Sequence, residues 1–301
     1  MPGAISCPLC GDAAKVLYSR PLDLEYFMEA EYELYRCRGC GLVFMHPQPT
    51  RDELPGLYPP EYQNFDQPAN PISRLLLDRY YEHQVSTCRR YVEPDGAFLE
   101  VGCAAGDVLD RMQERGYGDV QGVELSREAC ERAWARGLNV FHGTVDEFET
   151  DQLFSLIFMS HVIEHVLDPV ATVTKLSKLL RPGGVLYLET PNVASLDARL
   201  WKENWGLIHY PRHLYLFDRS TLRRLLEGGG LEVDKISWEI NSCGWALSVQ
   251  SALRRRGIDR SRRPRSFYYP VLLLMLLPMN VLDVGFGGTA FMSAIARKPE
   301  A

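Results

Sequence analysis

The sequence of 301 residues lacks an excess of positive charge, an apolar run long enough to span a bilayer, and a visible leader peptide. Its formal net charge of −6 argues against general nucleic-acid binding, so we expect no nucleic-acid partner. Its most apolar stretch, residues 271–279, falls well short of the roughly 20 residues that cross a membrane. No signal-peptide pattern precedes Cys7, so we expect a cytoplasmic protein, with membrane association left open.

Four of the eight cysteines form two C-x-x-C pairs, Cys7 with Cys10 and Cys37 with Cys40, and a glycine follows each pair. Such knuckles can bring four thiolates together as the closed tetrahedral site of a structural Zn²⁺, with no open position for catalysis. We expect this zinc, carried by a zinc ribbon over residues 1–50. Two disulfides or free thiols are the alternatives, and a reducing compartment favours metal.

The stretch FLEVGCAAGD, residues 98–107, is typical of a buried strand that ends in a glycine turn and leads into a helix. Gly102 and Gly106 allow a tight turn and close approach of the backbone to a ligand. The next strand ends at Glu124, 22 residues after Gly102, the spacing at which nucleotide-binding units place a carboxylate on ribose hydroxyls. An ordinary turn without a ligand is the alternative.

From residue 97 onward, strand and helix patterns alternate, which predicts a mostly parallel sheet with helices on both faces. Ligands of such sheets bind beyond the carboxyl ends of the strands. We expect strands at about 97–101, 120–125, 139–143, 154–160, 185–190, 231–239 and 290–297. We expect helices at about 72–92, 107–115, 126–136, 169–180 and 220–227.

Five short motifs together resemble class I S-adenosylmethionine-dependent methyltransferases, over roughly residues 95–240. They are LEVGCAAGD (99–107), VE (123–124), HVIEHVLDP (161–169), LRPGG (180–184) and LETPN (188–192). The double knuckle and PRHLYLF (211–217) resemble a zinc-bearing subgroup associated with methylation of sugars and other secondary metabolites.

The resemblance implies a doubly wound, Rossmann-like α/β fold with a seven-stranded, mostly parallel sheet whose last strand is antiparallel. The expected organisation is a zinc ribbon (1–50), a connector and helix (51–92), and a cofactor-binding methyltransferase domain (93–301) with a helical insertion at about 241–289. Where the family usually has G-x-G-x-G, this chain has Ala104 in place of the middle glycine. The cofactor-binding residues that the resemblance implies are Glu100, Gly102, Cys103, Ala104, Gly106, Glu124, Leu125, Thr144, Val145, Ser160 and His161.

Methyl transfer to a hydroxyl oxygen needs alignment of the acceptor and a base for its proton. Three histidines are candidates for this base: His161, His213 and His209. We favour His161, because the end of a strand holds a side chain more rigidly than a loop does. His213 is second, since Pro211 stiffens its approach.

The segment from His161 to His165 has two further interpretations. H-x-x-E-H is a protease metal motif, but that motif requires a helix and this one follows a buried strand. The segment also resembles the E-x-x-E-H site of metal-dependent RNA-end and quinone-precursor methyltransferases, with His161 in place of the first glutamate. His209 or His213 could then add a ligand for a divalent metal. We favour a third interpretation, in which His165 is structural.

Two later segments are candidates for contact with an acceptor or a partner. Residues 201–213 carry aromatics, two histidines and an arginine, which suits an acceptor-binding loop, although a packed loop is the alternative. Residues 254–265 hold seven arginines and one aspartate and precede the apolar stretch. Arginines beside an apolar helix favour peripheral membrane contact through residues 254–284. We prefer a core helix or a homodimer interface.

The sequence therefore predicts an S-adenosylmethionine-dependent methyltransferase acting on a small-molecule acceptor. The acceptor is expected to be a sugar or nucleotide-linked sugar, methylated on oxygen rather than carbon. A dinucleotide-dependent oxidoreductase is the first rival, although the chain lacks G-x-G-x-x-G. The second rival is a non-enzymatic zinc-ribbon adaptor with a degenerate cofactor fold.

Overall fold

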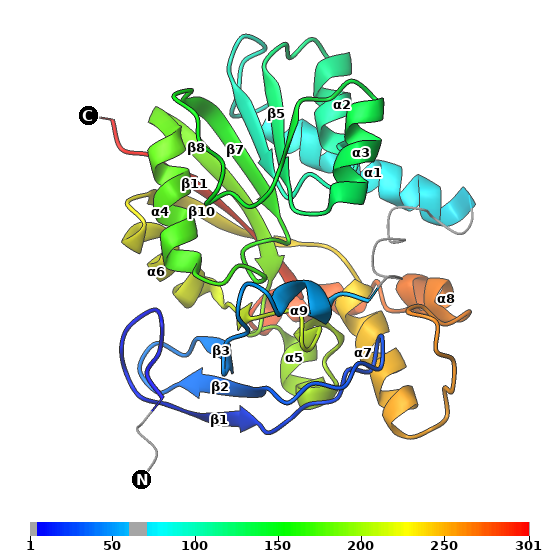
Figure 1. Ribbon diagram of the computed structural model, residues 1–301. Helices are drawn as coiled ribbons and strands as arrows, with labels where there is room; N and C mark the ends of the chain where they lie inside the picture. Colours follow the sequence, from blue (N-terminus) through cyan, green and yellow to red (C-terminus); the bar gives the residue numbers. More distant parts are fainter. Residues whose placement is uncertain (1–4, 60–70, 301) are drawn as a thin grey trace.

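The computed structural model describes residues 5–59 and 71–300, which form two sheets with helices around them (Figure 1). The expected connector therefore lies partly outside the described residues. Among the helices that the structure describes, none is long and apolar enough to cross a membrane.

The larger sheet has seven strands in the order β10-β11-β8-β7-β4-β5-β6. The strands are β4 (Phe98–Val101), β5 (Val120–Glu124), β6 (Val140–His142), β7 (Phe154–Ser160), β8 (Leu180–Pro191), β10 (Glu232–Glu239) and β11 (Phe291–Arg297). Only β11 runs antiparallel to its neighbours. The predicted seven-stranded, Rossmann-like α/β fold is confirmed, with each strand within a few residues of its expected place. The largest difference is β8, which starts at Leu180 rather than near 185 because Leu180 pairs with Phe154.

Alternation along the strands supplies two hydrophobic layers, one on each face of this sheet. Phe98, Leu156 and Tyr187 face one layer, and Leu99, Ile157 and Leu186 face the other. The first layer is completed by α1 (Pro71–Cys88), α2 (Asp107–Glu114) and α3 (Arg127–Ala135). The second is completed by α4 (Pro169–Leu179) and α6 (Arg219–Gly228). Side-chain caps start three of these helices, from Ser126, Asp168 and Asp218.

The smaller sheet joins the N-terminal region to the rest of the chain. Its order is β1-β2-β3-β9. Three strands come from the N-terminus, β1 (Ala14–Tyr18), β2 (Glu33–Cys37) and β3 (Val43–His46), and β9 (Tyr215–Leu216) comes from the loop after β8. Figure 1 shows the three N-terminal strands of this sheet, in blue, at the end of the molecule toward which β7 and β8 point. The ribbon therefore lies at the carboxyl edge of the large sheet, where a ligand is expected.

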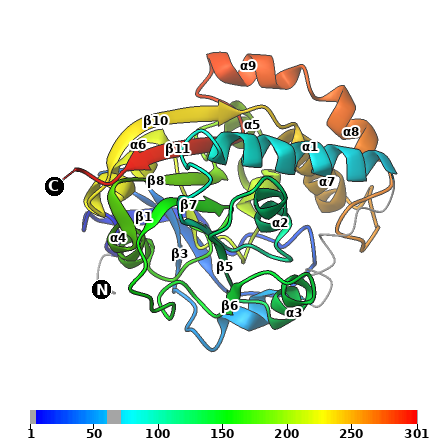
Figure 2. The same ribbon diagram turned by 90° about the horizontal axis from the view of Figure 1, so that it is seen from above.

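The remaining helices lie around that edge and in the insertion before β11. The chain after β8 forms α5 (Leu196–Trp201), and the insertion forms α7 (Cys243–Arg255), α8 (Tyr269–Met275) and α9 (Met279–Gly285). Short 3₁₀ turns occupy Leu54–Leu57, Lys202–Asn204 and Gly206–Ile208. Figure 2 shows α8 and α9 on the outer rim of the molecule, beyond α1 and α7. The predicted helical insertion is thus present.

Candidate functional site

The glycine turn after β4 has the backbone shape that the sequence predicts. Gly102 and Gly106 have φ of 76° and 81°, in the left-handed region that favours glycine. A Cβ on Gly102 would lie 2.3 Å from Val162 Cγ2, so the turn also leaves no room for a side chain there. Ala104 has φ of 46° as well, at a cost of roughly 1–2 kcal/mol for a residue with a Cβ. The alanine therefore adopts a positive φ, as the two glycines of the turn do.

Glu124, at the end of β5, faces this turn. Its Oε2 accepts a hydrogen bond from the Ala104 N–H at 2.9 Å, and its Oε1 accepts one from the Ser126 N–H at 2.7 Å. Each carboxylate oxygen can accept a second hydrogen bond, so the group remains suited to the hydroxyls of a ribose. The backbone donors fix the carboxylate beside the turn before any ligand binds.

Glu100 is the other acidic residue expected at the cofactor. It is buried, and its Oε2 has no hydrogen-bond partner among the residues that the structure describes. Burial, together with the neighbouring carboxylates of Asp107 and Glu124, raises the pKa of Glu100 well above its usual range. A positively charged ligand group beside this carboxyl, such as the ammonium of S-adenosylmethionine, would favour its ionised form and could satisfy the unpartnered oxygen.

The other expected cofactor residues lie along the same strand ends with different exposure. Cys103 is buried within the turn, and Leu125, directly after β5, is 56% exposed. Thr144 follows β6, where its N–H and its hydroxyl both donate to Glu147 Oε2 at 2.9 Å. Val145 is buried beside it. Their roles at the cofactor stay predictions.

A polar network from α1 reaches the end of β7 and was not predicted. Ser160 Oγ donates to Glu189 Oε2 at 2.7 Å, and Gln84 Nε2 donates to the same oxygen at 2.7 Å. Tyr80 Oη lies 3.1 Å from Ser160 Oγ. Tyr80 and Gln84 lie one turn apart on the helix that the sequence predicts over residues 72–92. Gln84, polar at a buried position of that helix, was the signal that could have revealed the network.

His161 has the most exposed side chain of the three candidate bases. Its backbone has φ of 55°, its Nδ1 lies 3.3 Å from Glu164 Oε1, and its side chain is 36% exposed. Burial opposes protonation, but the Glu164 carboxylate more than offsets this and raises the pKa of His161. Its ring meets the edge of Phe291 at a centroid distance of 5.2 Å. An oriented imidazole with access from one side is the arrangement that a base requires.

A family model described as a methyltransferase domain matches residues 74–236, more than half of the chain. The chain belongs to this methyltransferase family. The expectation of a class I S-adenosylmethionine-dependent methyltransferase is thereby confirmed, and the match covers the glycine turn, Glu124 and the histidine motif.

Curated relatives of this methyltransferase include two named for ubiquinone biosynthesis O-methylation. The one from Vibrio atlanticus is 29% identical over 149 residues, which is 44% of this chain and 62% of that protein. The mitochondrial one from Dictyostelium discoideum is 26% identical over 149 residues, 42% of this chain and 46% of that protein. The methyltransferase thus spans about half to three-fifths of the length of these relatives.

Solved structures share the fold at low sequence identity. A chain in the complex of the Haloferax volcanii Trm112 methyltransferase activator with a methyltransferase has a TM-score of 0.52 and 16% identity, covering 76% of this chain and 93% of that one. The structure of StiE O-MT has a TM-score of 0.50 and 14% identity, covering 77% of this chain and 78% of that one.

The other two candidate bases of the methyltransferase are enclosed by protein. His213 is buried, its Nδ1 lies 2.9 Å from the Leu207 carbonyl oxygen, and burial with its histidine neighbours lowers its pKa well below 6.5. His209 Nδ1 lies 2.5 Å from Glu25 Oε2, and its side chain is only 11% exposed. Residues 201–213 are thus mainly a packed loop, with Trp205 and Tyr210 also buried.

Two acids of the N-terminal region hold this loop, and no pattern in the sequence indicated them. Asp23 binds the fully buried Arg212 through two hydrogen bonds of 2.9 and 3.1 Å. Glu25 contacts His209 and forms an ion pair with Arg265. Burial opposes ionisation of Glu25, but His209, Arg265 and Arg212 lower its pKa below the usual range. The guanidinium groups keep Glu25 ionised, so His209 can stay neutral and donate from Nδ1 to it.

Glu164, His165 and His213 bring three potential metal-ligand atoms within 4.8 Å of one another. His165 Nδ1 lies 3.0 Å from both Tyr58 Oη and the Arg212 carbonyl oxygen, which leaves Nε2 available for a metal. Burial lowers the pKa of His165 to about 4, so its ring is neutral, the form that binds metals. The motif from 161 to 165 is a turn rather than a helix, unlike the protease arrangement.

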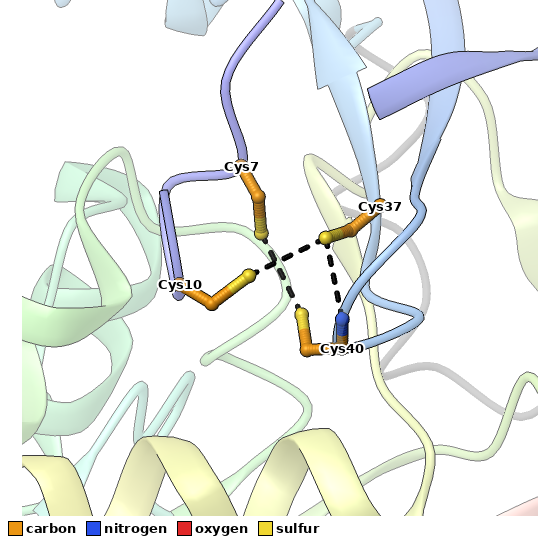
Figure 3. A group of neighbouring side chains, drawn as sticks. All are labelled: Cys7, Cys10, Cys37 and Cys40. Carbon is orange, nitrogen blue, oxygen red and sulfur yellow. Dashed lines mark hydrogen bonds between the residues drawn. The ribbon is translucent and has the colours of Figure 1, made fainter. Parts of the chain in front are cut away.

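The four cysteines of the two knuckles converge on one point. Figure 3 shows their sulfurs pointing toward one another, with Cys7 Sγ 3.6 Å from Cys40 Sγ and Cys10 Sγ 3.4 Å from Cys37 Sγ. Tetrahedral zinc with bonds of about 2.3 Å separates its sulfurs by roughly 3.8 Å, whereas a disulfide needs about 2.0 Å. None of the four forms a disulfide. The donor set and the spacing fit zinc.

Proposed function

We propose that this methyltransferase transfers the methyl group of S-adenosylmethionine to a hydroxyl oxygen of a small-molecule acceptor. One observation carries the proposal. A cofactor cradle, formed by the glycine turn and Glu124, and a half-exposed imidazole, His161, occupy the same carboxyl edge of the sheet. The cradle suits an adenosyl ligand, and the imidazole suits removal of a hydroxyl proton.

Bound S-adenosylmethionine supplies a methyl group already activated by the sulfonium. Glu124 would accept hydrogen bonds from the ribose hydroxyls of the cofactor. Glu100 would balance the positive charge of the cofactor's ammonium group. The chain's remaining task is to align the acceptor and take its proton. His161 Nδ1 faces Glu164, so Nε2 is the atom that would accept this proton. The Glu164 carboxylate raises the pKa of His161, which strengthens the imidazole as a proton acceptor.

The acceptor is proposed to be a sugar or nucleotide-linked sugar, with methylation on oxygen preferred over carbon. The zinc-bearing subgroup that the sequence resembles supports a sugar. The names of the relatives, ubiquinone biosynthesis O-methyltransferases, support oxygen as the methylated atom. A phenolic acceptor is therefore the comparison that the assay must include.

A divalent metal is a second way to activate the acceptor hydroxyl, favoured by the grouping of Glu164, His165 and His213. These residues would hold the ion, which would lower the pKa of a bound hydroxyl. Backbone carbonyl oxygens already orient both imidazoles, that of Arg212 at His165 Nδ1 and that of Leu207 at His213 Nδ1. Loss of activity in a chelator, restored by Mg²⁺ or Mn²⁺, would support this route over His161 alone.

The cysteine cluster is proposed to hold one structural Zn²⁺. A closed site of four thiolates has no position for a substrate, so the ion would stabilise the ribbon rather than take part in methyl transfer. The ribbon in turn holds the loop that carries His209 and His213. Zinc would therefore support the acceptor side of the site indirectly.

The test is methyl transfer from S-adenosylmethionine carrying a labelled methyl group. The full chain is incubated with separate sets of nucleotide-linked sugars, free sugars and catechols, and products are analysed by mass spectrometry. We expect one set to gain a single methyl group on oxygen. Reduction of NAD with any of these substrates would instead favour the oxidoreductase rival. Absence of S-adenosylhomocysteine binding would favour the adaptor rival.

A further inference from the structure

The surface of α8 and α9 exposes an unusual share of the apolar side chains. Of the 19 large apolar side chains that are exposed among the described residues, nine lie between Phe267 and Phe286. We call these nine the apolar face; they are Phe267, Val271, Leu274, Met275, Leu277, Val281, Leu282, Val284 and Phe286. A concentration of this kind marks an interaction surface rather than scattered exposed residues.

The polar residues of this segment point into the protein instead. Asn280 and Asp283 are 2% and 0% exposed, although they lie on the same short helix as Val281, which is 77% exposed. Asp283 Oδ2 accepts a hydrogen bond from Trp245 Nε1 at 2.9 Å, and Asn280 Oδ1 accepts one from the Asn241 N–H. A helix that packs on a core in water shows the opposite arrangement, with its apolar side inward. These inward contacts hold α9 with its apolar side chains outward, whereas α8 also packs Leu272, Leu273 and Leu276 against the core. The preference for a core helix or a homodimer interface stays a prediction.

Residues 254–265, from the end of α7 through the loop before α8, carry seven arginines and precede this face in the chain. Three of them form ion pairs within the protein: Arg254 with Asp259, Arg255 with Glu203 and Arg265 with Glu25. The other four are exposed and have no ion pair within residues 5–59 and 71–300; they are Arg256, Arg260, Arg262 and Arg263. From residue 260 to residue 282 the sequence contains no acidic residue and no lysine.

We propose that the apolar face and these four arginines dock the protein on the surface of an anionic membrane. Helices α8 and α9 have seven residues each, about 10 Å of helix, so they would lie in the interface rather than span it. Arginines beside inserted apolar side chains match the negative potential of such a surface. A second copy of the chain fits less well, because a symmetric contact would bring like charges together.

The docked surface would lie on the acceptor side of the site. Asn192, the residue after β8, donates from Nδ2 to the Gly287 carbonyl oxygen at 3.1 Å. Phe291, a few residues beyond α9, contacts the ring of His161. The chain after α9 therefore lies next to the ends of β7 and β8, and His161 directly follows β7.

Flotation of the full chain with lipid vesicles tests the proposal. Vesicles of phosphatidylcholine and phosphatidylglycerol in equal parts are compared with pure phosphatidylcholine, at about 50 mM and about 500 mM salt. We expect binding to the anionic vesicles at low salt and at least about tenfold weaker binding at high salt. The variant R260E/R262E/R263E is expected to bind the anionic vesicles at low salt about tenfold more weakly than the unmodified protein. Its matched control, R181E/R219E/R224E, changes the net charge equally at exposed arginines elsewhere and is expected to bind like the unmodified protein.

A second pair of variants tests the apolar face. Met275→Ser with Val281→Ser removes two side chains that are 70% and 77% exposed, so folding should be unaffected and vesicle binding should fall at least about tenfold. The control is Leu153→Ser with Leu200→Ser. Equal binding to neutral and anionic vesicles, or no binding at low salt, would overturn the proposal. The face would be assigned to a second copy if the protein had a dimer mass in solution, bound no vesicles, and lost the dimer only in the Met275→Ser with Val281→Ser variant. That result would also overturn the membrane proposal.

Discussion

Three residues of the candidate site hold a left-handed backbone conformation without being glycine. Ala104, His161 and His209 have φ of 46°, 55° and 46°. Such a conformation persists only where surrounding contacts require it, and it is common at functional sites. In the turn after β4 the requirement is visible, because the Ala104 N–H must point at Glu124. At His161 the backbone N–H bonds to the Glu189 carbonyl oxygen, which turns the chain at the end of β7.

Replacing Ala104 with glycine should therefore not destabilise the protein. The substitution removes a strain of roughly 1–2 kcal/mol, which offsets the extra freedom that glycine gives the unfolded chain. The matched control is Ala105, which is buried next to Ala104 and is not among the residues with a positive φ. Urea unfolding should show Ala105→Gly losing about 1 kcal/mol and Ala104→Gly losing nothing. An equal loss in both variants would mean that Ala104 is not strained.

His161→Ala should lower turnover by about 10²–10⁴ while S-adenosylhomocysteine affinity stays the same. The reason is that a neutral hydroxyl needs a positioned base, and His161 is the candidate with an exposed ring edge. Turnover is measured at saturating cofactor with the acceptor found by the labelling assay. His142→Ala, at an exposed histidine, is the control. A normal rate in His161→Ala together with a large loss in His213→Ala would contradict this role of His161. It would instead support activation of the hydroxyl by a metal that His165 and His213 hold.

At the level of elements, the ribbon and the loop after β8 form one unit. β3 pairs with β9, and Tyr210 Oη bonds to the backbone of Ala30 and Tyr32. Asp23 and Glu25 also hold this loop, because Asp23 forms an ion pair with Arg212 and Glu25 forms one with Arg265. The strands expected to bind the cofactor, β4 to β6, make none of these contacts, so we expect cofactor binding to depend less on the ribbon than acceptor binding does.

Asp23→Ala should destabilise the protein by about 3–5 kcal/mol, because it leaves the buried guanidinium of Arg212 without its main partner. Urea unfolding measures the loss. The double variant Asp23→Leu with Arg212→Met should recover most of it, since it removes both charges. Asp52→Ala, at an exposed aspartate, is the control. A loss below about 1 kcal/mol in Asp23→Ala would show that the buried pair does not hold the loop.

Purified protein should contain one zinc per chain by elemental analysis, and Cys37→Ser should lose it. Because metal binding is folding free energy in such small modules, this variant should unfold its N-terminal region at lower temperature. Turnover should fall through the β3–β9 pairing, while S-adenosylhomocysteine affinity should change little. Cys243→Ser, outside the cluster, should keep the zinc. Absence of zinc in protein prepared without chelators would contradict the assignment.

For the whole molecule, the sequence predicted the large sheet well, because buried parallel strands and glycine-ended helices leave strong local patterns. Glu124 and the four cysteines were found for the same reason, since each follows a fixed spacing. The sequence could not reveal that Asp23 meets Arg212, 189 residues away in the chain, or that β9, with two residues, joins the ribbon. It also could not show which sides of α8 and α9 face water, since nothing local in an apolar run distinguishes one side from the other.

The most direct test of the central claim is calorimetric titration of the full chain with S-adenosylhomocysteine and, separately, with NAD. We expect one S-adenosylhomocysteine per chain and no binding of NAD. Glu124→Ala should weaken that binding about tenfold or more through the lost hydrogen bonds to the ribose, while Glu128→Ala, on the exposed side of α3, should bind normally. Binding of NAD without S-adenosylhomocysteine, or unchanged affinity in a folded Glu124→Ala variant, would contradict the account.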